Sequence, residues 1–269
     1  MQPPDALGII AGSGAYPLLV AHSARAAGVS RIAAVAFNGE TDAALSQHVD
    51  AIEWLRVGQL GRLLSFFKSA GIRHAVMVGQ IAPRNLFDVR PDVKTLLLLA
   101  RLKRRNAETI FGAIADELAG IGVELLPATT FLDEHIAQRG IIAGRALSRR
   151  EDADVAYGLQ IAKEVSRLDI GQTVIVKGGT VVAVEAFEGT NEAIKRGGAL
   201  ARKGAVLVKV AKPNQDMRFD VPVIGPETIN VAASANVRVL AVEAGRTLLL
   251  ETHELISGAG AQGISVIGV

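Results

Sequence analysis

The chain has 269 residues, of which 49% are hydrophobic and 21% are charged. This length predicts one large domain or two of ordinary size, and the apolar content excludes a disordered chain. A net charge of +2 argues against nucleic acid as a partner. The absence of cysteine excludes disulfides, thiolate metal sites and cysteine nucleophiles. The sequence shows no signal-peptide pattern and no apolar run long enough to span a bilayer, so we expect a cytoplasmic protein.

The first half of the chain alternates between strand and helix patterns. Four buried strands are predicted at Ala6–Ala11, Arg31–Phe37, His74–Val78 and 123–126. Helices are predicted at 17–27 and 59–70, with two more before the last strand. Such alternation predicts a Rossmann-like parallel sheet covered by helices on both faces.

The second half begins after a connection at 131–148, and we place the domain boundary at about residue 132, which gives domains of 1–131 and 132–269. A helix is predicted at 191–203 with Thr190 or Asn191 as its N-cap. Further helices are predicted at 151–168 and 226–235, and strands at 174–176, 181–184, 205–210, 238–242 and 248–250. The first two of these strands read as a hairpin. This mixture of hairpins and crossovers predicts a mixed α/β domain.

A glycine turn, Gly12-Ser13-Gly14, lies between the first strand and the first helix. Backbone N–H groups at a helix start suit a phosphate or diphosphate. A second glycine follows another strand at Gly79-Gln80, and ligands collect at the carboxyl ends of parallel strands. A tight turn without a ligand is the alternative. The dinucleotide fingerprint is only partial, because Pro17 stands where its third glycine would be.

Two polar clusters lie in the second half. Residues 212–220 contain Asp216 and Asp220, two carboxylates that could share a magnesium ion, and Lys212 and Arg218, which could neutralise phosphate oxygens. Residues 185–191 place two acids before a helix start, an arrangement suited to a phosphate or a metal-bound water. Ordinary polar turns with capping side chains are the alternative for both clusters.

Other chemistry finds little support in the sequence. The five histidines have no zinc-ligand spacing, and no G-x-S-x-G elbow is present. Four leucines at 96–99 are followed by Arg101, Lys103, Arg104 and Arg105. We favour a core-facing helix with a solvated basic end over a segment that rests on an anionic membrane surface.

Several stretches together resemble one family, the UDP-2,3-diacylglucosamine pyrophosphatases of the LpxI type. The shared motifs are Leu7 to Gly14 with Pro17, Val57 to Gly61, Asp169 to Gln172, Ala183 to Asn191, Lys212 to Gly225 and Val242 to Gly245. They run in order through both halves, and several are long and unusual. One departure is Asn191, where aspartate is expected after Gly-Thr.

The resemblance implies an enzyme of lipid A biosynthesis in Gram-negative bacteria. Such enzymes hydrolyse UDP-2,3-diacylglucosamine to 2,3-diacylglucosamine 1-phosphate (lipid X) and UMP, through water attack on the α-phosphorus with Mg²⁺ as activator. It further implies two domains with the substrate between them, a homodimer, and an essential aspartate. We assign that aspartate to Asp220, with Asp216 as second choice.

We expect Asp220 to hold magnesium or to orient the water, with Asp216 as the other candidate metal ligand. Glu188 would assist, and Lys212 or Arg218 would stabilise charge on phosphate. The substrate would be bound by Gly12, Ser13, Gly14, Gly79, Gln80, Thr190 and Asn191. Because the implied substrate carries two fatty chains, peripheral contact with the inner membrane is a further expectation. A non-catalytic UDP-sugar or lipid-precursor binding protein and a nicotinamide-dependent oxidoreductase are the rival interpretations.

Overall fold

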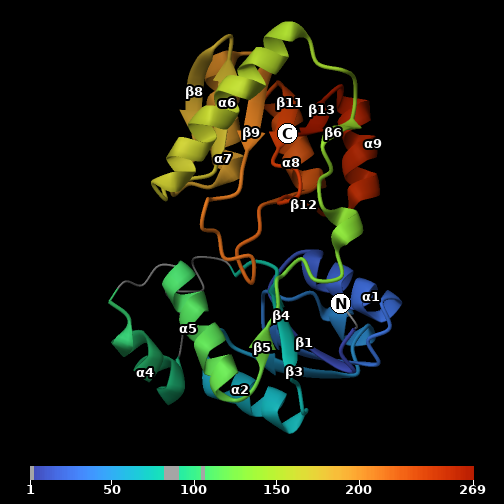
Figure 1. Ribbon diagram of the computed structural model, residues 1–269, viewed down its shortest axis with the longest axis vertical. Helices are drawn as coiled ribbons and strands as arrows, with labels where there is room; N and C mark the ends of the chain where they lie inside the picture. The colour runs from blue at the N-terminus through green and yellow to red at the C-terminus, as the bar shows by residue number, and fades with distance from the viewer. Residues whose placement is uncertain (1–2, 82–90, 104–106) are drawn as a thin grey trace. The chain divides into compact units, whose positions relative to one another are not determined.

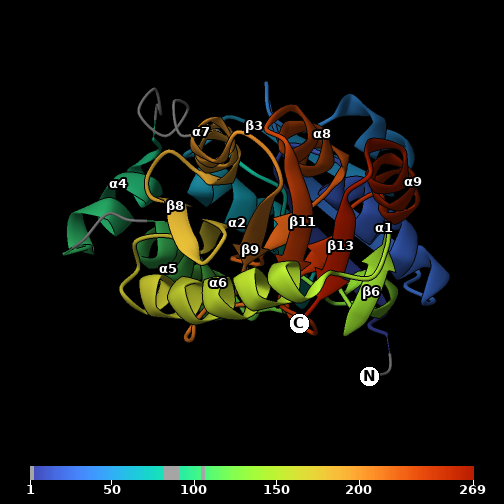
Figure 2. The same ribbon diagram turned by 90° about the horizontal axis from the view of Figure 1, so that it is seen from above.

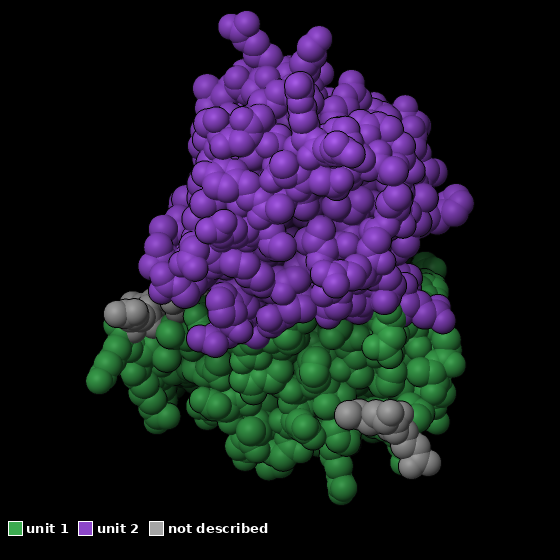
Figure 3. Space-filling view, turned by 45° about the horizontal axis from the view of Figure 1, so that its top comes forward, with its two compact units in different colours: residues 1–133, 216–220 green, residues 134–215, 221–269 purple. Residues whose placement is uncertain are grey.

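The computed structural model describes residues 3–81, 91–103 and 107–269 (Figure 1). The chain forms two compact units, coloured separately in Figure 3. Unit 1 consists of Met1–Asp133 and Asp216–Asp220, and unit 2 consists of Glu134–Gln215 and Val221–Val269. The five residues that contain both candidate aspartates therefore pack with unit 1, although their neighbours in the chain belong to unit 2.

Unit 1 is built on a parallel sheet, as the sequence predicts. Its strands lie in the order β3-β2-β1-β4-β5 and comprise β1 (Ala6–Ala11), β2 (Arg31–Phe37), β3 (Ala51–Leu55), β4 (His74–Val78) and β5 (Glu124–Leu125). The strand order reverses between β1 and β4, which makes this the switch point of the sheet. Because the two strands are parallel, their carboxyl ends lie side by side at one edge. In open α/β sheets that is where ligands bind.

The helices of unit 1 bury one apolar stripe each. They are α1 (Tyr16–Ala26), α2 (Leu60–Ser69), α4 (Val93–Arg101) and α5 (Ala107–Gly120), with a short 3₁₀ helix η1 (Ala43–Gln47). In α2 the residues Leu60, Leu63, Leu64 and Phe67 repeat at helical spacing and are buried in the core. Pro17 lies in the first turn of α1, as predicted.

Unit 2 has a mixed sheet of order β6-β13-β11-β9-β7-β8, which confirms the predicted mixed α/β class. Its strands are β6 (Gly140–Ala143), β7 (Thr173–Lys177), β8 (Thr180–Val184), β9 (Ala205–Lys209), β11 (Val237–Val242) and β13 (Ser265–Gly268). The central strands β9, β11 and β13 are parallel, while β7 runs antiparallel to β8 and β9 and β6 runs antiparallel to β13. Two short strands, β10 (Val223–Ile224) and β12 (Leu248–Leu249), pair separately.

Helices cover both faces of the unit 2 sheet (Figure 2). One face carries α6 (Arg149–Arg167), and the other carries α7 (Thr190–Ala201), α8 (Pro226–Ser234) and α9 (Thr252–Gln262). Because successive side chains of a strand point to opposite faces of the sheet, they pack into two separate hydrophobic cores. Val174 and Val176 face the α6 side, whereas Ile175 between them faces α7. Gly197 of α7 lies so close to the sheet that a Cβ there would stand 2.8 Å from Ile175.

The structure differs from the sequence predictions in several elements. The strands β3, β6, β10 and β13 and the helix α9 were not predicted. The N-cap of α7 is Gly189 with φ of 84°, and neither Thr190 nor Asn191 caps the helix. Thr190 is the first residue of the helix, and its hydroxyl donates to Glu185 and accepts from Lys209.

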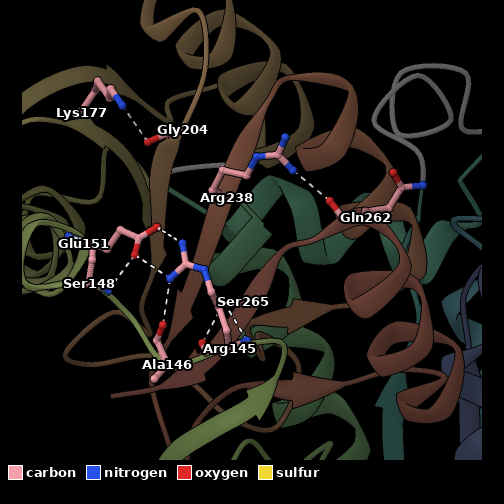
Figure 4. Close-up of polar contacts among 9 residues, drawn as sticks. All are labelled: Arg145, Ala146, Ser148, Glu151, Lys177, Gly204, Arg238, Gln262 and Ser265. Carbon is pink, nitrogen blue, oxygen red and sulfur yellow. Dashed lines mark hydrogen bonds and ion pairs between the residues drawn. The ribbon is translucent and has the colours of Figure 1, made fainter.

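The start of α6 is held by a capping box with an added ion pair (Figure 4). The Ser148 hydroxyl accepts from the Glu151 N–H, and the Glu151 carboxylate accepts from the Ser148 N–H at 2.8 Å. Arg145 donates to both carboxylate oxygens of Glu151 at 2.7 and 2.9 Å. These donors, Arg145 first, lower the pKa of Glu151 from 4.5 to about 2.

This lowered pKa predicts an acid-sensitive contribution to stability. Because the native state favours the Glu151 carboxylate, its contribution is complete above pH 4.5 and is lost as the pH falls toward about 2. We expect Glu151→Gln to lower the free energy of unfolding by about 1 kcal/mol at neutral pH, since Gln retains the capping geometry and exposed Arg145 is screened by solvent.

Urea denaturation across a pH series measures this difference, which should shrink in acid. The matched control is Glu164→Gln, which breaks an exposed pair with Arg167 in the same helix and should cost less than about 0.5 kcal/mol. A pH-independent difference for Glu151→Gln would contradict the assignment.

Candidate active site

The two predicted glycine turns come together at the switch point of unit 1. Ser13 and Gln80 form a backbone bridge, with Ser13 N–H donating to the Gln80 carbonyl at 2.7 Å and Gln80 N–H returning a bond at 3.3 Å. A Cβ on Gly12 would lie 2.5 Å from the Gln80 carbonyl oxygen, and Gly79 has φ of 89°. Glycine is therefore required at both positions by the close approach of two backbones.

This packing engages backbone donors that the sequence analysis assigned to the substrate. The N–H groups of Gly12, Ser13 and Gln80 are all bonded to carbonyl groups of these strand ends. The adjacent helix α1, in contrast, begins without any side-chain cap. Its first turn, just after Gly14, thus supplies the N–H groups and the positive helix end at this edge of the sheet.

The segment 216–220 is anchored at the same edge of unit 1. The Met217 carbonyl accepts from Ala128 N–H at 2.8 Å, just beyond β5. The Ala128 carbonyl in turn accepts from the Tyr16 hydroxyl of α1 at 2.9 Å, and burial raises the pKa of Tyr16. Phe219 packs on Phe111 of α5 with ring centroids 5.6 Å apart. These contacts fix the segment that carries both candidate aspartates to the chain after β5, which Tyr16 of α1 also contacts, and to α5.

The two aspartates have different surroundings. Arg218 donates to both carboxylate oxygens of Asp216, at 2.9 Å from Nε and 2.6 Å from an Nη atom. This guanidinium holds the pKa of Asp216 below its ordinary value. Asp220 donates its backbone N–H to the Asp216 carbonyl at 2.9 Å, which fixes the turn. Among the described residues, no hydrogen bond or ion pair engages the Asp220 carboxylate. Of the two aspartates, Asp220 is therefore the one whose carboxylate oxygens are not occupied by Arg218.

Unit 2 carries a buried polar network where β8 and β9 end and β7 begins. Lys209 and Glu185 are each only 7% exposed. The Lys209 ammonium donates to the Thr190 hydroxyl at 3.2 Å and to the Val223 carbonyl at 3.0 Å. The Thr190 hydroxyl in turn donates a hydrogen bond to the Glu185 carboxylate at 2.8 Å. Since Thr190 bridges two buried charges, its first role here is structural.

The remaining predicted residues of unit 2 have partners of their own. Glu188 pairs with Arg196, which lowers the pKa of that carboxyl. The Asn191 amide donates to Glu227 at 2.9 Å, and Lys212 pairs with Asp169. No group of three or more His, Asp or Glu side chains within residues 3–81, 91–103 and 107–269 has the arrangement of a metal site.

Sequence reasoning missed two lysines of unit 2, the buried Lys209 and the partly exposed Lys163. Lys209 interrupts an otherwise apolar run from Ala205 to Ala211, a signal that could have revealed it. Lys163 on α6 donates to Glu243 at 2.6 Å, and Glu243 also accepts from the Ala211 N–H at 2.8 Å. This pair fixes the chain just before Lys212, but nothing in the helical pattern of α6 distinguishes Lys163 from a solvated lysine.

Comparison with known proteins assigns the whole chain. The family model described as the LpxI N-terminal domain matches residues 6–135, and the LpxI C-terminal domain matches residues 138–267. The chain belongs to the LpxI family. The UDP-2,3-diacylglucosamine pyrophosphatase LpxI of Caulobacter vibrioides is 31% identical over 274 residues, which span 98% of this chain and 97% of that relative. The resemblance found in the sequence is thereby confirmed.

A solved structure matches more weakly. The biotin carboxylase domain of Hydrogenobacter thermophilus 2-oxoglutarate carboxylase covers 67% of this chain, at 11% identity and a TM-score of 0.29, and the match spans 36% of that chain. A likeness at this level carries no argument about fold or function.

The LpxI models divide the chain between residues 135 and 138, so the family's C-terminal domain includes Asp216 and Asp220, which pack with unit 1.

The buried network predicts a large stability cost for a change at Lys209. Lys209→Met keeps the length and apolar stem but leaves the Thr190–Glu185 pair without its cation, so we expect the free energy of unfolding to fall by about 2–3 kcal/mol. The matched control is Lys177→Met in the same sheet, where an exposed ammonium bonds one carbonyl (Figure 4) and the expected change is below about 0.5 kcal/mol. Urea denaturation of both variants measures this. If Lys209→Met unfolded with the same free energy as Lys177→Met, the hydrogen-bonded ammonium of Lys209 would not be important for stability.

Proposed function

We propose that this chain hydrolyses the diphosphate of UDP-2,3-diacylglucosamine, giving 2,3-diacylglucosamine 1-phosphate (lipid X) and UMP in lipid A biosynthesis. The observation that carries the proposal is the anchoring of Asp220 at the ligand-binding edge of unit 1, through Met217, Ala128 and Tyr16. The named activity of the Caulobacter relative supports the substrate.

In this proposal the nucleotide side of the substrate lies at the switch point of unit 1. The uncapped first turn of α1 offers N–H donors and a positive helix end to the diphosphate. The bridge between Ser13 and Gln80 holds the two glycine turns against one another, so the shape of this edge is fixed before substrate arrives. Gly12, Gly14 and Gly79 then serve by keeping side chains away from it.

The reaction itself is the attack of water on the α-phosphorus. The water oxygen bonds to phosphorus, the bond from the α-phosphorus to the bridging oxygen breaks, and its electron pair leaves with 2,3-diacylglucosamine 1-phosphate. Asp220 has the free carboxylate that can orient the water and accept its proton. Asp216, bound by Arg218, positions the turn that presents Asp220.

Cationic groups would stabilise the charge that develops on phosphate. The guanidinium of Arg218 is the candidate within unit 1, where Asp216 engages one edge of it. In unit 2, Lys212 is the candidate cation, while Glu188 and Asn191 flank the start of α7 and support the assisting and substrate-binding roles proposed for them.

Magnesium fits this donor set in one mode. Mg²⁺ keeps several waters and is commonly held by one or two carboxylates plus substrate phosphates, which does not require three clustered protein ligands. Asp220 is the residue that would hold it, and Asp216 contributes less because Arg218 occupies its oxygens. When bound, the ion would screen the diphosphate charge. Family membership further supports a homodimer and a cytoplasmic location.

Substitution of the two aspartates tests which one is catalytic. We expect Asp220→Asn to lower the rate of UMP release at least about 100-fold, because the amide cannot accept a proton from water. Asp216→Asn should cost about tenfold, since it weakens only the grip of Arg218 on the turn. Thermal unfolding should be unchanged for Asp220→Asn. A variant that turns over at a near-normal rate would remove Asp220 from the mechanism.

The reaction in ¹⁸O-labelled water tests the site of attack. We expect the label in the phosphate of UMP and none in the lipid phosphate, and we expect EDTA to abolish turnover until Mg²⁺ is restored. Label in the lipid phosphate would exclude attack on the α-phosphorus. Tight binding of the substrate without UMP release would favour the non-catalytic binding protein, and binding of NAD(H) in a titration would favour the oxidoreductase.

A further inference from the structure

The helix α4 is fixed to unit 1 by its inner face. Asp92 caps it, accepting from Thr95 N–H at 2.8 Å, and also accepts from Gly61 N–H of α2 at 2.7 Å. The Thr95 hydroxyl donates to the Gly58 carbonyl at 2.6 Å. Leu98 is buried in the core of the unit. The prediction of a core-facing helix therefore holds for this face.

The outer face of α4 is apolar as well. Val93, Leu96 and Leu97 are 72%, 53% and 53% exposed. They lie three and four residues apart, so they form one stripe opposite Leu98, and Ala100 extends it. In the part of unit 1 that the structure describes, every exposed large apolar side chain lies on this stripe. Such concentration marks an interaction surface.

Basic side chains flank the stripe. Lys94, Arg101 and Lys103 are all exposed, and the chain has no acidic residue from Val93 to Lys103. The Asp92 carboxylate is engaged by backbone N–H groups, so it does not offset this charge at the surface. Glu117 of α5 pairs with Lys94 and is the acidic neighbour that faces the helix. Arg104 and Arg105 continue the basic run in the sequence but lie outside the described residues.

We propose that the outer face of α4 docks on the surface of an anionic lipid bilayer. An apolar stripe beside long basic side chains matches the interface of such a bilayer, where leucines enter the acyl boundary and ammonium and guanidinium groups reach the headgroups. No helix in the described ranges is both long and apolar enough to cross a membrane. An acidic protein partner would have to place carboxylates opposite these particular basic side chains. An anionic bilayer presents negative charge and an apolar interior along its whole surface.

The use of this surface rests on the proposed function, because a substrate with two acyl chains resides in a bilayer. Docking through α4 would hold unit 1 where such a substrate is available. The surface consists of α4 residues alone, so its binding to lipid can be tested without any UDP-sugar.

Sedimentation with vesicles tests the proposal. The full chain is mixed with vesicles of phosphatidylcholine, with or without phosphatidylglycerol, in the absence of substrate. We expect binding to the anionic vesicles only, weakening as salt is added. Leu96→Asp combined with Leu97→Asp should reduce the partition coefficient at least about tenfold. Arg101→Gln should reduce it about fivefold.

The matched control is Leu200→Asp, a change at a similarly exposed leucine of α7 in unit 2, which should bind like the wild type. All variants should retain wild-type circular dichroism, and the α4 double variant should release UMP from detergent-solubilised substrate within about twofold of the wild-type rate. The proposal would be overturned if the wild type did not bind anionic vesicles or if the α4 double variant bound them normally. It would also be overturned if the double substitution instead abolished an oligomer of the wild type. Absence of UMP release by wild type would contradict only the proposed function.

Discussion

Ala128, the buried residue that follows the last strand of the first sheet, uses both of its backbone groups to assemble the candidate site. Its carbonyl accepts from Tyr16 at the start of α1, and its N–H donates to Met217. Each bond is individually worth about 1 kcal/mol. Together they join three segments that are far apart in the sequence: the glycine-turned start of α1, the end of β5 and the aspartate segment. Asp220 owes its place at this edge to that joint.

The topology of the sheet makes this arrangement chemically useful. Because the strand order reverses between β1 and β4, the chain leaves the sheet in opposite directions there and the edge stays open. The two glycine turns pair with one another through their backbones at this edge of the sheet. In the proposed reaction, the first turn of α1 is left to bind phosphate, and Asp220, held in place through Met217, is the proposed base. Arg218 keeps the second carboxylate, Asp216, occupied, so the pair does not act as two equivalent ligands.

Periodicity and glycine placement predicted the buried strands of unit 1 and the hairpin of unit 2, because an apolar run or an alternating pattern is a local property. The strand β3 was missed because its burial is mostly partial, and β6 and α9 because their patterns are interrupted or glycine-rich. The candidate residues were found by type and by resemblance. Their partners could not be predicted, since the network at Lys209 and the anchor at Ala128 depend on long-range packing and the bond from Arg218 to Asp216 depends on the path of an irregular turn.

The division of the chain has a consequence for how its activity can be dissected. The polypeptide passes between the units after Asp133, Gln215 and Asp220, so unit 1 is completed only when residues 216–220 have been synthesised. A fragment that ends at the boundary of the LpxI N-terminal domain, residue 135, contains the glycine turns and α1 but no Asp220. The complementary fragment contains Asp220 without Ala128, Tyr16 or Phe111. Neither half reproduces the contacts that position the Asp220 carboxylate, so the proposed catalytic arrangement requires the undivided chain.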